Sequence, residues 1–170
     1  MWVIIDHTTA VSANPKCACM ALQDMFGRPR RTDEEVAHIP RRVLFMRDPM
    51  ERFYSAYCYF CMVRDKGGEY KPLGKGKPDN YEDFVDRTFE IRDRHWDPQV
   101  ANCLAYTEVM GWRELPAFVQ KVSGRPMVHT NSSPKYPYDS CYRRDELTAR
   151  YAADYDMINT MPVAQRPRAA

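Results

Sequence analysis

Hydrophobic and polar positions form a clear pattern around residues 43–60. Residues 43–46 are all apolar, which is typical of a strand buried on both faces. Asp48 and Pro49 follow directly and favour a helix start, because Asp caps free N–H groups and Pro lacks an N–H that the first turn leaves unpaired. Apolar residues then recur at the spacing of one helix face: Phe53, Ala56, Tyr57 and Phe60. The pattern predicts a central strand that runs through a charged turn into an amphipathic helix.

The same reasoning predicts the remaining elements. We expect strands at 2–6, 10–13 and 105–109, with the first two paired around a turn. We expect one helix that ends at Phe26 and three helices at 81–90, 112–122 and 143–158. A further short helix is expected to begin at Thr32 or Asp33 and to end before Pro40. Strands and helices that alternate in this way predict an α/β class with a mainly parallel sheet in a three-layer α/β/α arrangement.

Chain length predicts one compact domain over residues 1–160. Residues 66–78 hold four of the seven glycines and four lysines, so we expect a flexible loop there, either a solvated connection or an arm that grips an acidic substrate. Residues 161–170 are expected to form a frayed tail.

The charge of the chain is nearly balanced, with a formal net charge of +2, which does not favour a nucleic-acid partner. Its distribution is uneven: residues 41–77 carry nine Lys and Arg against four acids, and residues 79–97 carry seven acids against three arginines. This separation suits a site for an anionic ligand.

No apolar run approaches the ~20 residues that cross a bilayer, and the N-terminus lacks the pattern of a signal peptide. We therefore expect a cytoplasmic protein without a membrane contact, in which the six cysteines are reduced. Cys58 and Cys61 lie on the central helix and are expected to pack in the core rather than bind metal.

Arg47 lies at the carboxyl end of the predicted central strand, beside a helix N-terminus that favours an anion. The motif around it consists of Arg47, Asp48, Pro49, Arg52, Ser55 and Tyr57. This motif resembles the 3'-phosphate-binding motif of sulfotransferases, which use 3'-phosphoadenosine 5'-phosphosulfate (PAPS), and most of all that of the carbohydrate sulfotransferases of the chondroitin, dermatan and HNK-1 type. The resemblance implies that Arg47 and Ser55 bind the 3'-phosphate.

Residues 14–20 combine a strand end, a tight turn with a lysine and a helix start, which predicts a second phosphate site. The glycines of a Walker A loop are absent. The segment resembles the P-K-x-A-C-T loop that binds the 5'-phosphosulfate in the same family. The resemblance implies a role for each residue of the loop: Pro15, Lys16, Cys17, Ala18, Cys19 and Met20. Lys16 would stabilise the leaving group, whereas Met20 replaces a family Thr or Ser and lacks its hydroxyl.

Residues 92–99 place charge, a histidine and a tryptophan in a loop with a proline. This segment resembles the H-W-x-P segment of the same enzymes and implies a substrate side formed by Arg92, Arg94, His95 and Trp96. His95 is the candidate catalytic base, because histidine titrates near neutrality. Alternatively, His95 only forms a hydrogen bond across the loop, and His38 or Glu35 is the base instead. The family's cysteine pair after this motif is reduced to Cys103, which puts its disulfide in doubt.

Residues 129–135 resemble the H-x-N-S-S segment that closes over the nucleotide in this family. The resemblance implies nucleotide contacts from Ser132, Ser133 and Lys135.

Together these resemblances imply a P-loop-like sulfotransferase fold and transfer of a sulfuryl group from PAPS to a hydroxyl of a carbohydrate, or of another hydroxyl-bearing acceptor, without a metal. Two alternatives stay open: a non-catalytic module that binds an anion or nucleotide, and, less favoured, a nucleotide-dependent kinase. The sequence specifies neither the acceptor nor the oligomeric state.

Overall fold

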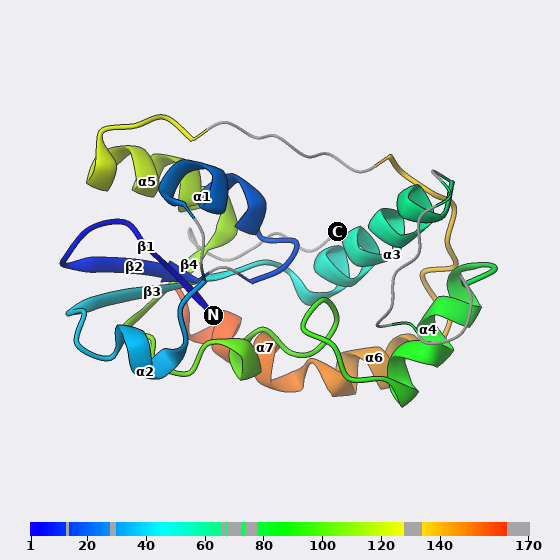
Figure 1. Ribbon diagram of the computed structural model, residues 1–170. Helices are drawn as coiled ribbons and strands as arrows, with labels where there is room; N and C mark the ends of the chain where they lie inside the picture. Colours follow the sequence, from blue (N-terminus) through cyan, green and yellow to red (C-terminus); the bar gives the residue numbers. More distant parts are fainter. Residues whose placement is uncertain are drawn as a thin grey trace.

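The computed structural model describes residues 1–12, 14–27, 30–65, 67, 73, 78–127 and 134–162, with the side chains of 64 and 65 left out. The predicted loop at 66–78 therefore lies mostly outside the described residues. The fold is a mixed α/β arrangement around a four-stranded sheet (Figure 1).

The sheet has the order β1-β2-β3-β4. Its strands are β1 (Trp2–Ile4), β2 (Thr9–Ser12), β3 (Arg41–Met46) and β4 (Glu108–Gly111). β1 pairs antiparallel with β2, as the predicted strand pair required, whereas β2 with β3 and β3 with β4 are parallel. The prediction of a mainly parallel sheet is confirmed.

Helices surround this sheet. They are α1 (Cys19–Phe26), α2 (Asp33–Val36), α3 (Pro49–Asp65), α4 (Tyr81–Glu90), α5 (Leu115–Ser123), α6 (Arg144–Arg150) and α7 (Ala152–Thr160), with short 3-10 turns η2 (Val100–Asn102) and η3 (Trp112–Glu114). Asp48 accepts the N–H of Glu51 as the predicted cap of α3, and Thr32 forms a capping box with Glu35 at α2.

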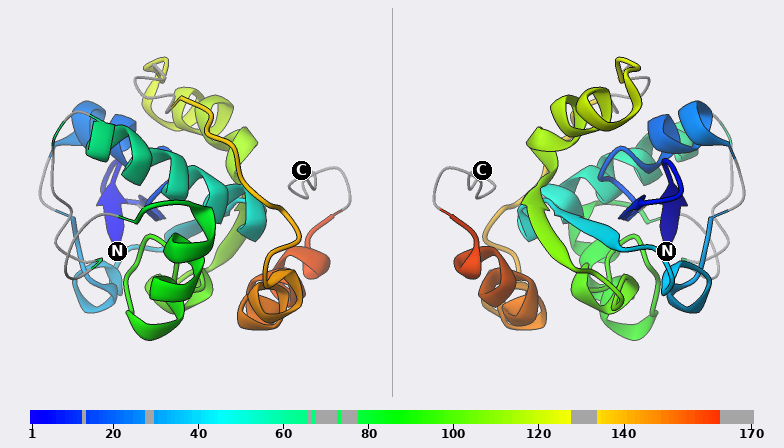
Figure 2. Two further views of the ribbon diagram at one scale, coloured as in Figure 1. Left: turned by 90° about the vertical axis from the view of Figure 1, so that its right-hand side faces the viewer. Right: turned by 90° about the vertical axis from the view of Figure 1, so that its left-hand side faces the viewer.

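Side chains of the central strand alternate between two buried clusters, as the period of a strand requires. Val43 and Phe45 pack with residues of α1 and α5, and Leu44 and Met46 pack with residues of α2 and α7. Figures 1 and 2 show α1 and α5 on one side of the sheet and α2 and α7 on the other. A third cluster, between α3, α4 and α6, consists largely of aromatic residues and includes Cys58 and Cys61, which confirms their packing in the core.

Several boundaries differ from expectation. β1 ends at Ile4, β2 spans Thr9–Ser12, and α5 begins at Leu115 after a 3-10 turn. β4 begins three residues later than predicted, because Asp33 Oδ1 accepts the N–H groups of Leu104 and Ala105 and draws that segment away from the sheet. The single helix predicted at 143–158 is divided at Tyr151, whose fully buried side chain donates to the Trp96 carbonyl. Met161 is buried, so the predicted frayed tail is wrong at that residue, and residues 163–170 lie outside the described part.

No helix in the described ranges is long and apolar enough to span a bilayer. Within the same ranges, no group of three or more His, Cys, Asp and Glu side chains is arranged to hold a metal ion.

Candidate active site

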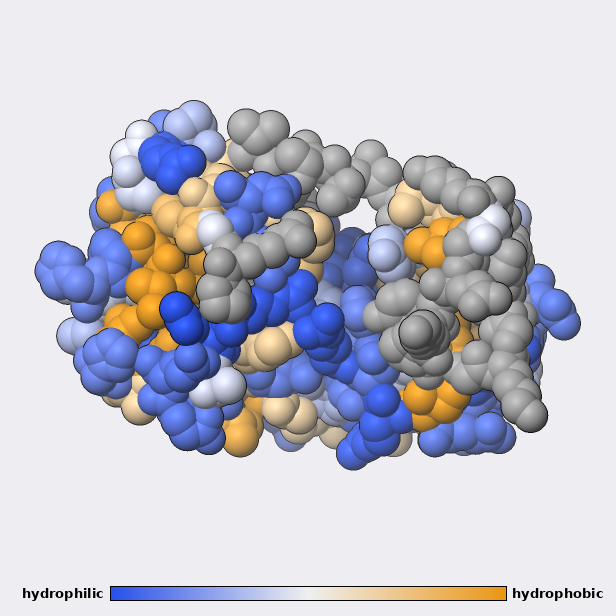
Figure 3. All heavy atoms as spheres, viewed as in Figure 1, coloured by the Kyte–Doolittle hydropathy of each residue, from blue (hydrophilic) through white to orange (hydrophobic). Residues whose placement is uncertain are grey.

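Three loops meet at one edge of the sheet. The lysine loop (residues 14–18) follows β2, the arginine turn (residues 47–48) follows β3, and the histidine loop (residues 92–99) lies between α4 and η2. Because β2 and β3 are parallel neighbours, their carboxyl ends share this edge, which is where ligands bind in open α/β sheets. In Figure 3, hydrophilic residues gather between the half of the molecule that holds the sheet and the half that holds α3 and α4.

The lysine loop has an uncommon backbone. Lys16 and Ala18 adopt φ values of 66° and 59°, a left-handed conformation that is rare outside glycine and that clusters at ligand sites. The N–H of Cys17 donates to the Asn14 carbonyl over 3.1 Å and closes the turn. α1 begins at Cys19, and among the described residues no side chain caps its N-terminus. A tight turn followed by an uncapped helix start is suited to hold an anion.

The arginine turn contacts the lysine loop directly. Arg47 Nη1 donates to the carbonyl of Lys16 over 3.0 Å, and its Nε is 3.4 Å from a carboxylate oxygen of Glu51. The guanidinium lies 4.9 Å from the ring centroid of Trp112, which follows β4. The structure thus brings Lys16 and Arg47, from two separate motifs, to one place.

Gln99 is a fully buried amide that joins the arginine turn to the lysine loop. Its Oε1 accepts the N–H of Arg47 at 3.0 Å and the thiol of Cys17 at 3.3 Å. Its Nε2 donates to the Arg47 carbonyl at 2.8 Å and to buried Asp154 at 3.2 Å. Asp154 also accepts the N–H groups of Gln99 and Val100, so α7 fixes the orientation of the amide.

Arg52 joins the lysine loop to the histidine loop from within the core. Its side chain is fully buried and donates to three carbonyls: Pro15 at 3.3 Å, Asp97 at 2.9 Å and Arg94 at 2.5 Å. A buried guanidinium that loses these acceptors would be costly, so the contacts hold the two loops in register.

Lys16 has an altered acidity. Burial is the largest effect and lowers the pKa of Lys16 to about 8. The nearby cysteines, Cys19 first, oppose this shift, and the positive charge of Arg47 adds to it. Its Nζ lies 4.6 Å from the ring centroid of Tyr59 on α3, a cation–π contact. Lys16 therefore remains a cation at neutral pH, in surroundings poor in water.

His95 is held by Asp93. The imidazole Nδ1 is 2.5 Å from Asp93 Oδ1, which also accepts the main-chain N–H of His95 at 2.9 Å. Burial acts to raise the pKa of Asp93, but the hydrogen bonds from His95 outweigh it and the pKa is lowered. With Nδ1–H directed at a carboxylate, the neutral ring carries its lone pair on Nε2, as a general base requires.

Tyr59 contacts both of these groups. Its ring is parallel to the His95 ring within 2°, with 6.5 Å between centroids, and it also contacts the Lys16 ammonium. Lys16 and His95 therefore share an aromatic neighbour.

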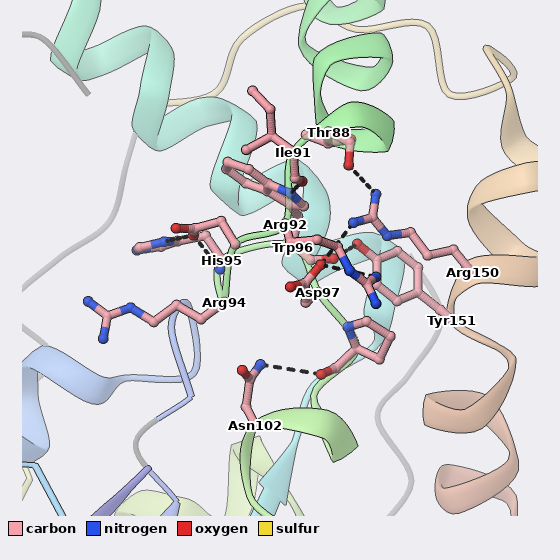
Figure 4. Close-up of polar contacts among 12 residues, drawn as sticks. Thr88, Ile91, Arg92, Arg94, His95, Trp96, Asp97, Asn102, Arg150 and Tyr151 are labelled. Atoms are coloured by element: carbon pink, nitrogen blue, oxygen red, sulfur yellow. Dashed lines mark hydrogen bonds and ion pairs between the residues drawn. The ribbon is translucent and has the colours of Figure 1, made fainter. Parts of the chain in front are cut away.

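The remaining residues of the histidine loop divide into two groups. Figure 4 shows Arg94 and His95 extending to the same side of the loop, whereas Trp96 lies against Ile91 and donates to its carbonyl. Trp96 is fully buried among Phe60 and Phe84, so the expectation that it contacts substrate is corrected: it anchors the loop. Arg92 is 80% exposed and lies 3.6 Å from Asp97.

The other residues of the lysine loop contribute in different ways. Burial raises the pKa of Cys17 to about 12, so its thiol is a hydrogen-bond donor to Gln99 and no nucleophile. Pro15 offers its carbonyl to Arg52, Cys19 is buried, and Met20 is exposed at the surface.

The predicted nucleotide contacts are only partly described. Ser55 is half-buried on α3. Lys135 Nζ lies 5.2 Å from the ring centroid of Tyr54, the residue that precedes Ser55 on this helix. Ser132 and Ser133 lie outside the described residues.

The alternative bases are not supported. Glu35 is engaged in the capping box of α2 and pairs with Arg31, and exposed His38 precedes β3, at the opposite end of that strand from Arg47. Sequence reasoning missed Asp93, Gln99, Tyr59 and the carbonyl contacts of Arg52. Only Asp93 had a local signal, since it is two residues from the candidate base.

A comparison with known families gives one match. The model described as "Sulfotransferase family" matches residues 7–121, a range that contains all three loops. No curated protein and no solved structure matches this chain.

Proposed function

The chain belongs to the sulfotransferase family, and from this premise we propose that it transfers a sulfuryl group from PAPS to a hydroxyl of a carbohydrate. In this proposal the helices on both faces of the sheet form the three-layer, P-loop-like arrangement of such enzymes, within a single domain. The observation that carries the proposal is the contact between the lysine loop and the arginine turn, together with the contacts that Lys16 and His95 each make with Tyr59.

The two loops suit a nucleotide with anionic groups at both ends. The lysine loop, with its left-handed residues and the α1 N-terminus, binds the 5'-phosphosulfate through main-chain N–H groups and the Lys16 ammonium. Arg47 binds the 3'-phosphate together with Ser55 and the segment that contains Ser132, Ser133 and Lys135. The donor set consists of nitrogen groups and hydroxyls, which is the chemistry that phosphate and sulfate oxygens require.

The transfer step needs one base and one cation. The Nε2 atom of His95 accepts the proton of the attacking hydroxyl, while the hydroxyl oxygen forms a bond to sulfur. Lys16 neutralises the bridging oxygen that keeps the electron pair of the broken sulfur–oxygen bond. Both groups are fixed in advance by Asp93, Tyr59 and the main chain, so little rearrangement opposes the reaction.

Exposed arginines extend the site toward solvent. Arg94 extends to the same side of the loop as His95, whereas Arg92 extends toward Asp97 (Figure 4), and both exposed arginines would contact the carbohydrate, or another hydroxyl-bearing acceptor, as it approaches.

Two measurements test the proposal. Calorimetry with 3'-phosphoadenosine 5'-phosphate against ATP should show selective binding of the former, and labelled PAPS with a panel of glycans should reveal transfer. Lys16→Ala and His95→Ala should each lose transfer, whereas exposed Lys121→Ala and His38→Ala should retain it. Wild-type rates in Lys16→Ala would contradict the mechanism.

Met20 favours a second candidate, a binding module without catalysis. Its exposed thioether stands where a hydroxyl would donate to the 5'-phosphate. Selective nucleotide binding without transfer to any acceptor would support this candidate over the enzyme.

A further inference from the structure

An arginine outside the recognised motifs lies next to Arg47. Arg113 belongs to η3, which follows β4, and β4 is the parallel neighbour of β3. Arg113 and Arg47 therefore come from the carboxyl ends of adjacent strands, at the edge of the sheet that holds the candidate site.

Glu51 connects the two arginines. One carboxylate oxygen is 3.4 Å from Arg47 Nε and the other is 3.2 Å from Arg113 Nη2. The ring of Trp112 lies beneath both, with its centroid 4.9 Å from the Arg47 guanidinium and 6.0 Å from that of Arg113. The two cations thus share a counter-ion and an aromatic neighbour.

The charge balance of this cluster decides what it can bind. Glu51 neutralises one positive charge, so Arg47 and Glu51 alone offer no net charge to a phosphate monoester. A second arginine restores a net positive charge, which a doubly charged phosphate requires for tight binding.

Arg113 is also accessible. Its side chain is 51% exposed, whereas those of Arg47 and Glu51 are 15% and 16% exposed. A guanidinium has five N–H donors in a planar fork, so Arg113 can bind Glu51 and a phosphate oxygen together.

We propose that Arg113 is an additional anion-binding residue that contacts the 3'-phosphate of the nucleotide beside Arg47, with Glu51 as the counter-ion that holds both arginines. This inference rests on the proposed function and extends it to a residue outside the recognised motifs.

Calorimetry with two nucleotides tests this role. Arg113→Ala should weaken binding of 3'-phosphoadenosine 5'-phosphate by about tenfold, the effect of one lost charge-assisted hydrogen bond, and should change binding of adenosine 5'-phosphate by less than about twofold. Arg113→Lys should restore part of the loss. Glu51→Gln should tighten binding of the 3'-phosphorylated nucleotide, because the competing negative charge is removed.

Arg31→Ala is the matched control, since Arg31 is 41% exposed, also pairs with a single glutamate, and has its main chain paired with that of Trp2 on β1. It should leave both affinities unchanged. Equal affinities in Arg113→Ala and the wild type, or an equal loss for both nucleotides, would overturn this inference alone. A wild-type protein that does not bind the 3'-phosphorylated nucleotide would overturn the proposed function and this inference together.

Discussion

Lys16→Met should stabilise the protein while it abolishes transfer. Burial and Arg47 lower the pKa of Lys16 from 10.5 to about 8, and each pKa unit corresponds to about 1.4 kcal/mol. The charged lysine therefore lowers the free energy of unfolding at pH 7 by roughly 3 kcal/mol. Methionine retains most of the apolar stem but loses the cation–π contact with Tyr59, worth about 0.5–1 kcal/mol. We expect a net gain of about 2 kcal/mol.

The pH dependence has a definite sign. Between pH 8 and 10.5 the unfolded chain keeps a proton on Lys16 that the folded protein has lost, so the stability of the wild type rises with pH across this window. The penalty from Lys16 is complete below pH 8 and disappears above 10.5. The advantage of Lys16→Met should therefore be largest at pH 7 and fall to less than about half by pH 9.5.

Urea denaturation followed by tryptophan fluorescence at pH 7 and pH 9.5 measures this difference. Lys121→Met is the matched control: Lys121 is exposed on α5, so its replacement should change the free energy of unfolding by less than about 0.5 kcal/mol. If Lys16→Met were no more stable than the wild type at pH 7, or if its advantage grew with pH, the inferred burial of a charged lysine would be refuted.

Three further predictions concern the same site. Asp93→Asn should reduce the rate of single-turnover transfer at least about 100-fold, because Nδ1–H of His95 loses its carboxylate partner. Calorimetry should show unchanged nucleotide affinity, and a loss of rate below about threefold would contradict the role of the Asp93–His95 pair. Gln99→Met has similar volume but leaves the main-chain N–H and carbonyl of Arg47 without the amide that pairs with both. Urea denaturation should therefore show a loss of about 2–4 kcal/mol together with weaker nucleotide binding, and an unchanged midpoint would count against it. The kcat/KM for PAPS should fall above about pH 8 as Lys16 loses its proton, whereas a flat profile from pH 7 to 9.5 would exclude this dependence.

Local patterns predicted the elements well. The strand, turn and helix from residue 43 onward, and the helix start expected at Thr32 or Asp33, depend on neighbours within a few residues, so one sequence contains the information. The start of β4 and the division of the helix at Tyr151 depend instead on Asp33 and on the Trp96 carbonyl, which are distant in sequence. Residue types alone do not reveal such contacts.

The candidate site shows the same limit. Motifs identified Lys16, Arg47 and His95 because each occurs in a distinctive local setting. Trp96 was misjudged as a substrate contact because its burial arises from aromatic residues of α3 and α4. Gln99 had no local signal, because its role depends on hydrogen bonds with Arg47, 52 residues away in the sequence, and with Cys17, 82 residues away.

The buried polar groups explain why the site can be rigid without glycine-rich loops. Arg52 and Asp154 are both fully buried, and the hydrogen bonds of each are mainly with main-chain groups. Arg52 donates to three loop carbonyls, and Asp154 accepts two main-chain N–H groups. A loop that moved would leave a charged group without partners in the core, at a cost of several kcal/mol. That cost opposes relaxation of the left-handed residues at Lys16 and Ala18 and of the desolvated ammonium. Donors fixed in this way are already aimed when a ligand arrives, which is the condition for electrostatic catalysis.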